Sequence, residues 1–318
     1  MWKDYLMDYS NTYKWMDKIT KMPPLIITVA VNGGVQGKEM HSLLPERSDE
    51  IAEEAYKAYN AGASIVHIHG RDPECLWKTT DKTEVYRDIN RKVREKCPDI
   101  IVNNSTGASD SNLDGRLQRI DALPEIASLN MGPEMVRFQM PPRTGVEHCH
   151  NGYLDDNCSG TTYGYLEGLA KGMLERNVKP EMELYHGGQY WVSQELIKKG
   201  ILKPPYYFQF VMGYQTSLYP TPENLIQLVK ELPENSVFSG IGIGKFQWTM
   251  TAMSIILGGN VRVGLEDNLY LKRGEKLKDN AAAVDRIVQL AKYFHREVAT
   301  PAQAREILGL DPNPRQWK

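Results

Sequence analysis

The chain has 318 residues, of which 41% are hydrophobic and 25% charged, enough material for a globular protein with a full core. Because 38 basic residues nearly balance 40 acidic ones and no basic block occurs, nucleic acid and anionic membranes are disfavoured as partners, and small-molecule chemistry is expected. Four cysteines are too few for a disulfide scaffold, and neither a membrane span nor an apolar signal-peptide run is evident, which predicts a cytoplasmic protein.

The chain begins with an amphipathic segment over residues 1–22. Its apolar side chains fall on one face of a predicted helix: Trp2, Tyr5, Leu6, Tyr9, Tyr13 and Met16. Such a face must be buried, either against the floor of the following domain or against a neighbouring subunit. We therefore expect an N-terminal helical arm on a catalytic domain over residues 23–318, in a homo-oligomer, with a tetramer as the suspected size.

From residue 25 onward, short apolar segments alternate with longer segments of helical periodicity. Strands are predicted at residues 25–31, 64–69, 100–104, 126–130, 181–184, 206–211, 237–241 and 261–265. Helices are predicted at residues 49–61, 82–96, 113–123, 161–175, 190–199, 222–231, 249–257 and 281–294. This alternation predicts a parallel (β/α)8 TIM barrel. An open doubly wound sheet is the alternative, but no GxGxxG sequence follows the first strand.

Residues 133–160 interrupt this alternation with a segment rich in Pro, Gly, Asn and Asp. We expect a long polar loop at the carboxyl face of the barrel, where lids over active sites belong. Its cluster of His148, His150, Cys149 and Cys158 is a weaker metal-site candidate, because the spacing matches no established zinc pattern.

The second predicted strand carries two histidines on one face. His67 and His69 are two residues apart, so both imidazoles point to the barrel interior while Val66 and Ile68 point outward. The last strand ends in Glu266 and Asp267, which can reach the histidines across the barrel mouth. Two imidazoles and a carboxylate form an open divalent metal site for zinc or non-haem iron. The alternative is that the histidines only make hydrogen bonds in the core.

Other strand ends supply polar groups to the same mouth. Ser105, Thr106 and Gly107 form a hydroxyl and amide nest for a carboxylate or carbonyl oxygen, and Ser128 and Asn130 follow on the next strand.

Two charged residues complete this inventory. Glu183 lies between Met182 and Leu184, so its carboxylate points inward, which requires a partner or a function. Lys245 lies in the glycine-rich sequence after the seventh strand and is either an anion-binding residue or part of a plain turn. A Lewis-acid metal, spare carboxylates and neutral donors together suit enolate chemistry.

At this point the sequence resembles the β-keto acid cleavage enzyme family. The resemblance is carried by PLIITVA at 24–30, AGASIVHIHGRDP at 61–73, STG at 105–107, ASLN at 127–130 and GNVRVGLEDN at 259–268. It implies a zinc-dependent TIM barrel in which a β-keto acid and acetyl-CoA give acetoacetate and a new acyl-CoA. Claisen condensation, acyl transfer and retro-Claisen cleavage are the implied steps.

The resemblance also implies roles for individual residues. The zinc ligands would be His67, His69 and Glu266, and Asp267 would be the acid/base. The keto acid's carboxylate would be held by Ser105, Ser128 and Asn130, with Glu183 as a further pocket carboxylate.

Two positions depart from the family pattern. Val35 stands where an acidic residue is usual, and Lys245 replaces an arginine expected to support the catalytic aspartate. Lysine keeps the charge but lacks the bidentate fork of arginine. The identity of the keto acid therefore stays open.

Two other readings of the same residues remain. The first is another metal-dependent barrel enzyme, such as an aldolase, a lyase or an iron oxygenase, which would turn over without CoA. The second is a barrel that binds a metal or a ligand without turnover.

Overall fold

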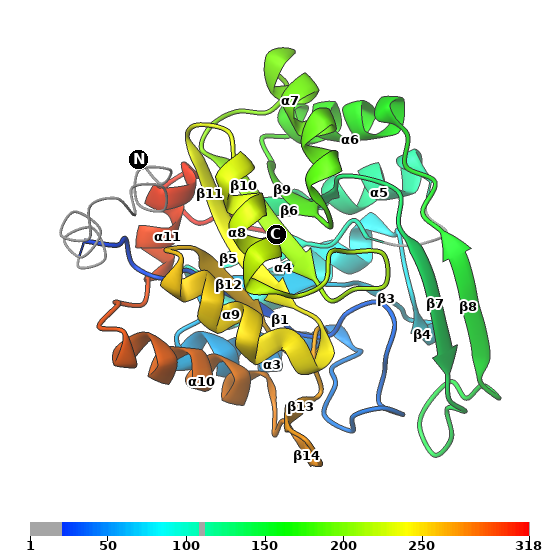
Figure 1. The fold of residues 1–318 in the computed structure, drawn as a ribbon. Coiled ribbons are helices and arrows are strands. Elements are labelled where there is room, and N and C mark those ends of the chain that lie inside the picture. The colour runs from blue at the N-terminus through cyan, green and yellow to red at the C-terminus, as the bar shows by residue number, and fades with distance from the viewer. Residues whose placement is uncertain (1–20, 108–111, 318) are drawn as a thin grey trace.

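Eight parallel strands form a closed barrel in the computed structural model, which describes residues 21–107 and 112–317 (Figure 1). The barrel strands are β1 (Ile27–Ala30), β2 (Ile65–Ile68), β5 (Ile101–Asn104), β6 (Ile126–Asn130), β9 (Lys179–Leu184), β10 (Tyr206–Met212), β11 (Ser236–Gly242) and β12 (Asn260–Val263). The first and last strands pair in parallel, with Ile27 opposite Val261. The predicted TIM barrel is confirmed, and its closure brings β2 and β12 to either side of β1.

Helices follow the strands and cover the outside of the barrel (Figure 1). They are α3 (Ser48–Ala61), α4 (Thr83–Lys96), α5 (Leu113–Ile120), α6 (Tyr163–Glu175), α7 (Tyr190–Lys198), α8 (Pro222–Glu231), α9 (Gln247–Ile256) and α10 (Asn280–Tyr293). Short 3-10 helices, η1 (Gly187–Gln189) and η2 (Gly244–Phe246), precede α7 and α9. The predicted arm over residues 1–22 lies almost wholly outside the described residues.

The barrel interior changes from apolar at the amino ends of the strands to polar above. The lowest layer is formed by Ile26, Ile65, Ile101, Ile126, Tyr207 and Val237. A short helix that the sequence pattern did not predict, α11 (Pro301–Leu308), closes this floor with Ala304 and Leu308. The next inward position of several strands is polar, as at His67, Glu181 and Arg262, so the site stands on a polar middle layer.

The segment expected to be a polar loop is in part a β-hairpin. β7 (Met135–Met140) and β8 (Tyr153–Cys158) pair antiparallel through six residue pairs. On β7, Val136, Phe138 and Met140 are more buried than their neighbours, which is the alternation of a strand with one covered face. Two shorter hairpins, β3–β4 (Arg71–Asp72, Cys75–Thr79) and β13–β14 (Tyr270–Lys272, Glu275–Lys276), also stand outside the barrel. Within the described residues, no helix is long and apolar enough to cross a membrane.

Candidate functional site

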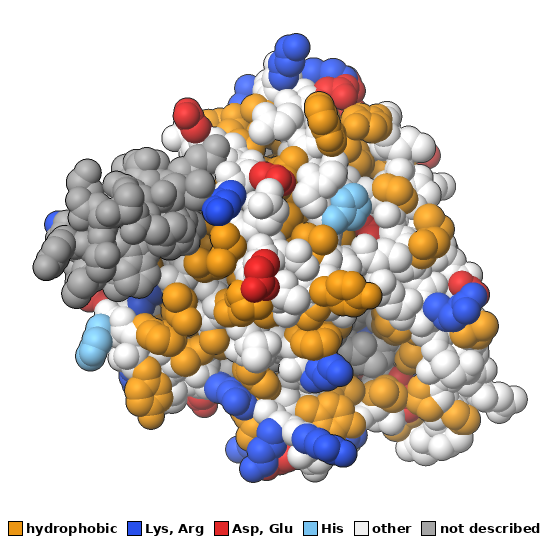
Figure 2. All heavy atoms as spheres, in the orientation of Figure 1, with side chains coloured by type: hydrophobic (Ala, Val, Ile, Leu, Met, Phe, Trp, Pro, Cys, Tyr) orange, Lys and Arg blue, Asp and Glu red, His pale blue; other side chains and the backbone are white. Residues whose placement is uncertain are grey.

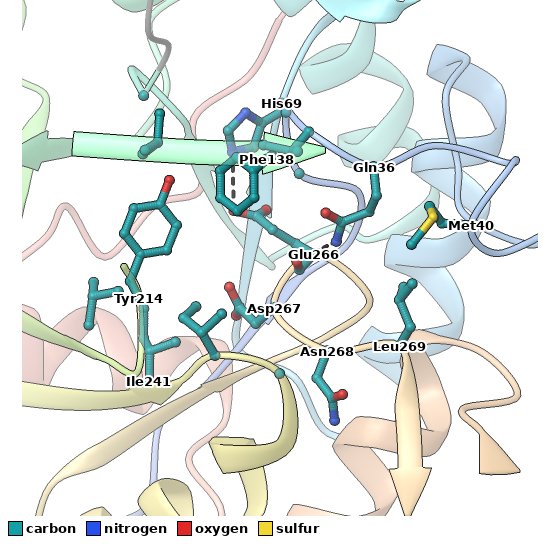
Figure 3. A pocket seen from close by; sticks show the side chains of 18 of the residues that line it. Gln36, Met40, His69, Phe138, Tyr214, Ile241, Glu266, Asp267, Asn268 and Leu269 are labelled. Carbon is teal, nitrogen blue, oxygen red and sulfur yellow. Dashed lines mark hydrogen bonds and ion pairs between the residues drawn. The ribbon is translucent and has the colours of Figure 1, made fainter. Parts of the chain in front are cut away.

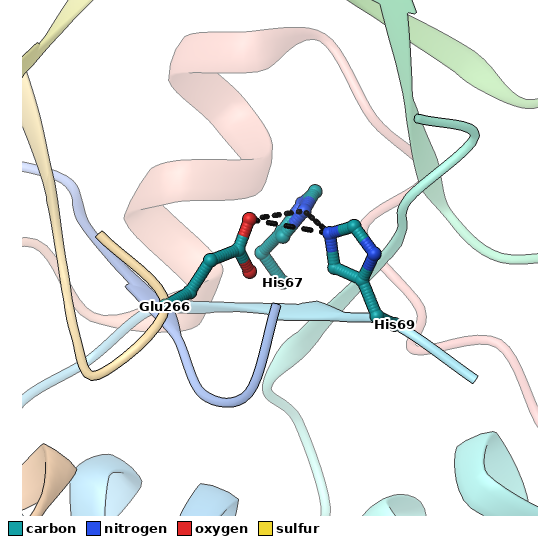
Figure 4. Close-up of side chains that lie close together, drawn as sticks. All are labelled: His67, His69 and Glu266. Atoms are coloured by element: carbon teal, nitrogen blue, oxygen red, sulfur yellow. Dashed lines mark hydrogen bonds and ion pairs between the residues drawn. The ribbon is translucent and has the colours of Figure 1, made fainter. Parts of the chain in front are cut away.

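The two strand histidines and the strand-end glutamate meet at the barrel mouth (Figure 4). The Nε2 atoms of His67 and His69 are 3.4 Å apart. Glu266 Oε1 lies 3.7 Å from Nε2 of His67 and 3.2 Å from Nε2 of His69. Side chains from β2 and from the turn after β12 therefore aim three ligand atoms at one point.

This spacing fits a divalent metal ion. Ligand atoms about 2.1 Å from one tetrahedral ion are separated by roughly 3.4 Å, which matches the three separations here. Burial lowers the pKa of both imidazoles, in His67 well below its usual range, so both rings are neutral and have lone pairs to donate. Burial alone would raise the pKa of Glu266, but Arg262 and the imidazoles lower it well below its usual range. The three residues could thus hold zinc or a similar ion.

Two glycines allow Glu266 to reach this place. Gly33, after β1, has φ +65°, and a Cβ there would lie 2.8 Å from Cγ of Glu266. Gly264, after β12, has φ +143°, and a Cβ there would lie 2.1 Å from the carbonyl oxygen of Ala30. Gln36 then donates from Nε2 to the carbonyl oxygens of Leu265 and Glu266, at 3.0 and 2.5 Å. The turn is consequently fixed by backbone as well as side-chain contacts.

Arg262 connects three carboxylates at the base of the mouth. Its guanidinium donates to both carboxylate oxygens of Asp267 at 3.0 Å, to Glu266 Oε1 at 2.5 Å and to Glu183 Oε1 at 3.2 Å. Glu266 and Asp267, the two of these carboxylates that are ionised at neutral pH, exceed this one guanidinium by one negative charge, which favours a bound cation. Within the described residues no hydrogen bond or ion pair joins Lys245 to Asp267, so Arg262 replaces residue 245 as the support of this aspartate.

The carboxylates differ in their protonation. Burial raises the pKa of Asp267 to about 6 and that of Glu183 to about 8, in both cases against the opposing charge of Arg262. At neutral pH, Asp267 is therefore mainly ionised and Glu183 mainly protonated. Glu183 Oε2 also accepts from Asn130 Nδ2 at 2.6 Å, which fixes the inward orientation predicted for this side chain.

The structure separates the five predicted substrate-binding residues into two groups. Ser105, Gly107 and Asn130 line the cavity above the metal-ligand group. Thr106 and Ser128 are fully buried behind it and bind each other, since Ser128 Oγ accepts from the Thr106 amide at 2.9 Å. Ser105 Oγ in turn accepts from the amide of Gly107 at 3.1 Å.

One cavity of about 1130 Å³ contains these groups (Figure 3). Figure 3 shows Glu266 and Asp267 pointing into it, with Phe138 and Tyr214 on one side and Leu269 on the other. The strand ends of β9, β10 and β11 add an apolar cluster formed by Tyr185, Val211, Tyr214, Ile241 and Ile243. Polar groups at the floor, among them the donors of Ser105, Gly107 and Asn130, and an apolar wall suit a small polar substrate joined to a less polar group.

Sequence reasoning missed Arg262 and Glu181. Glu181 is fully buried below the site and accepts from Asn103 Nδ2 at 2.7 Å and from Gln209 Nε2 at 3.0 Å. Arg262 lies between Val261 and Val263 on β12, a pattern that places it inward just as Met182 and Leu184 place Glu183. The alternation that identified Glu183 therefore contained the signal for Arg262.

The second metal candidate, in residues 147–158, is not assembled as a ligand group in the described part of the chain. His148 Nδ1 accepts from the amide of Leu76 at 3.0 Å, and His150 Nδ1 accepts from the amide of Gly152 at 3.0 Å. Both rings therefore fix loop backbone.

Comparisons with known proteins identify the family of the chain. A family model described as beta-keto acid cleavage enzyme matches residues 24–310. The chain is 38% identical over 290 residues to a 3-keto-5-aminohexanoate cleavage enzyme from Fusobacterium nucleatum subsp. nucleatum, which covers 91% of this chain and 99% of that protein. It is 30% identical over 295 residues to a 3-oxoadipate:acetyl-CoA acetyltransferase from Cupriavidus necator, covering 90% and 95% of the two chains.

Among solved structures, apo ObcA has a similar fold. The TM-score is 0.68 at 20% sequence identity, and the match covers 84% of this chain and 66% of ObcA. The chain therefore spans about two thirds of the length of ObcA.

Proposed function

Because the chain belongs to the beta-keto acid cleavage enzyme family, we propose that it cleaves a β-keto acid with acetyl-CoA, yielding acetoacetate and a new acyl-CoA. The names of the relatives describe keto acid cleavage and transfer with acetyl-CoA, which supports this reaction class. The observation that carries the proposal is the position of Asp267, an ionised carboxylate held by Arg262 beside the His67, His69 and Glu266 group.

Zinc is the metal we propose for the three ligands. When bound, it would polarise the keto carbonyl and so lower the pKa of the adjacent carbon acid. Ser105, Gly107 and Asn130 lie along the cavity wall and supply hydroxyl, amide and carboxamide donors for the substrate carboxylate.

Asp267 performs the proton transfer. Its carboxylate accepts a proton from the carbon between the keto and carboxylate groups, and that carbon attacks the thioester carbonyl of acetyl-CoA with CoA thiolate as leaving group. The CoA thiolate then attacks the original keto carbon. Cleavage of the old carbon–carbon bond leaves the electron pair on the acetoacetate fragment, which takes up a proton. Arg262 keeps Asp267 oriented throughout, since both carboxylate oxygens bind its guanidinium.

The test combines labelled acetyl-CoA with a panel of β-keto acids. We expect the acetyl label in the keto half of acetoacetate and the remaining acyl group on CoA. Asp267→Asn, which keeps the shape of the side chain, should lower kcat about 10²- to 10⁴-fold and leave the zinc content unchanged. His67→Ala should lose zinc and activity together.

Two results would contradict the proposal. Full activity in protein stripped of metal would exclude the role of zinc. Turnover of a keto acid without any CoA ester would favour an aldolase or lyase instead.

A further inference from the structure

Three cationic side chains line the outer end of the active-site cavity. They are Lys245 on η2, and Lys272 and Arg273 at the tip of the β13–β14 hairpin; we call them the cationic rim. All three are exposed, and Figure 2 shows Lys and Arg side chains gathered over this hairpin at the bottom of the view. The same cavity reaches down to Glu266 and Asp267, so the rim and the reacting groups share one space.

The rim is held in place relative to the site. The amide of Gly244 on η2 donates to the carbonyl oxygen of Asp267 at 2.7 Å. Trp248 Nε1, in the first turn of α9, donates to the carbonyl oxygen of Tyr270 on β13 at 3.3 Å. These contacts join the segment after β11 to the hairpin after β12, the two loops that hold phosphate groups in many TIM barrels.

The charge of the rim is largely uncompensated by protein carboxylates. In residues 21–107 and 112–317, neither Lys245 nor Arg273 forms an ion pair with a carboxylate, and Lys245 Nζ lies 5.1 Å from the centroid of the Phe246 ring. Lys272 pairs with Glu275 at 2.9 Å. Two free cations at a cavity mouth whose floor is rich in carboxylates indicate a ligand with an anionic outer end.

We propose that Lys245 and Arg273 bind the phosphate groups of CoA, with Lys272 adding positive charge beside them. This inference rests on the proposed function, because only a CoA thioester brings phosphates to this cavity. A CoA molecule placed this way has its phosphates at the rim and its thioester directed to Asp267. Lys245, which sequence reasoning placed beside the catalytic aspartate, thereby receives a different role.

The test measures binding of ligands that carry three, two and no phosphate groups. Calorimetric titrations of CoA, 3′-dephospho-CoA and pantetheine are made with the wild type and with Lys245→Ala, Arg273→Ala and the double variant. Each single variant should weaken CoA binding about five- to twenty-fold, since exposed charge-assisted contacts to phosphate are lost. Pantetheine, which has no phosphate, should bind all four proteins with the same Kd.

Lys278→Ala is the matched control, because Lys278 is exposed just beyond the same hairpin but does not line the cavity. It should bind CoA as the wild type does. In turnover, the rim variants should raise the KM for acetyl-CoA and change kcat less than two-fold, since no reacting group is altered.

The inference is overturned if the double variant binds CoA as the wild type does, or if pantetheine binding weakens as much as CoA binding. The binding assay needs no turnover, so its outcome is independent of the reaction proposed above. Absence of acetoacetate with phosphate-dependent CoA binding would contradict the reaction and leave the rim assignment standing. Normal acetoacetate formation with CoA binding that does not depend on the phosphates would support the reaction and contradict the rim assignment.

Discussion

Arg262 determines the geometry of the site at the scale of single residues. It is almost fully buried, and it donates to Asp267, Glu266 and Glu183 from one planar guanidinium. A lysine has one compact ammonium group and cannot span three carboxylates in this way. Orientation of Asp267 therefore depends on the shape of the guanidinium as well as on its charge.

Arg262→Lys should lower kcat for acetoacetate formation about 10²-fold, because Asp267 loses its bidentate partner and small displacements of a reacting group are costly. Steady-state kinetics with acetyl-CoA measure this loss. The matched control is Arg305→Lys, a buried arginine on α11 that pairs with Glu125 at 2.6 Å, far from the cavity. The control should lower the melting temperature and leave kcat near the wild-type value. Equal kcat values for Arg262→Lys and wild type would contradict this role.

Sequence reasoning brought His67, His69 and Glu266 together but missed Arg262, which orients the carboxylates beside them. His67 and His69 were recognisable because their spacing is local, and Glu266 because strand closure is a general property of barrels. The contact between Arg262 and Asp267 depends on the turn at Gly264, whose conformation is set by the approach of Ala30. The close contact between Gly264 and the backbone of Ala30 joins distant parts of the chain, so no local sequence pattern predicts it.

At the scale of elements, the β7–β8 hairpin covers one side of the cavity. Phe138 faces inward and lies 5.9 Å from the ring of Tyr214, centroid to centroid, and Tyr214 lies 5.7 Å from Tyr185. These contacts continue the apolar wall from the strand ends to the hairpin. The hairpin is thus part of the substrate pocket as well as its cover.

Phe138→Ala should raise the KM for the β-keto acid about five- to thirty-fold, because the pocket loses an aromatic surface of the kind that contributes about 1–2 kcal/mol. Initial rates at varied keto acid concentration measure the change. Met135→Ala, on the same strand but with its side chain 63% exposed, is the control and should leave KM unchanged. A similar effect of both variants would show that the hairpin acts only through its stability.

Glu134, at the base of this hairpin, makes stability depend on pH. Its carboxylate accepts from Ser159 Oγ at 3.0 Å, and burial raises its pKa to about 7 although Ser159 and Arg116 oppose the shift. The folded protein retains this proton between about pH 4.5 and 7, where the unfolded chain has lost it. The contribution of the protonated Glu134 to the stability of the fold is therefore fully present below about pH 4.5 and is lost as the pH rises through about 7.

Glu134→Gln removes this titration and keeps the size of the side chain. At pH 5 the variant should melt close to the wild type. At pH 8 it should melt at a higher temperature, and its free energy of unfolding should exceed that of the wild type by up to about 3 kcal/mol. Thermal unfolding of both proteins at the two pH values measures the difference. The exposed Glu223→Gln on α8 should show no such pH dependence. A difference that shrinks from pH 5 to pH 8 would contradict the assigned protonation.

The barrel strands and their helices were predictable because each has its own periodicity. The β7–β8 hairpin was not, since its frequent Pro, Gly, Asn and Asp residues indicate a loop and its strands exist only through pairing with each other. The same holds for α11, whose role is to close the floor below Ile26 and Tyr207. Such elements form because of tertiary contacts, which local sequence periodicity does not reveal.

At the scale of the whole molecule, the proposed zinc ion should stabilise the fold. An ion that binds only the folded chain raises the free energy of unfolding by about 2.7 kcal/mol when its free concentration is one hundred times its Kd. For a chain of this length, that corresponds to an increase of about 4 °C in melting temperature. Thermal melts of metal-stripped protein with and without zinc measure this shift. His67→Ala should show no shift, and an equal shift in the variant would place the ion elsewhere.

The pairing of β12 with β1 has a consequence for synthesis of the protein. His69 and Glu266 are separated by 197 positions in the chain, and the three-ligand site exists only after β12 has paired with β1. A ribosome-bound chain that lacks its last barrel strand has two ligands and no closed floor. Tight binding of the proposed zinc would thus be postponed until β12 has been synthesised and has paired with β1, so zinc binding would report closure of the barrel.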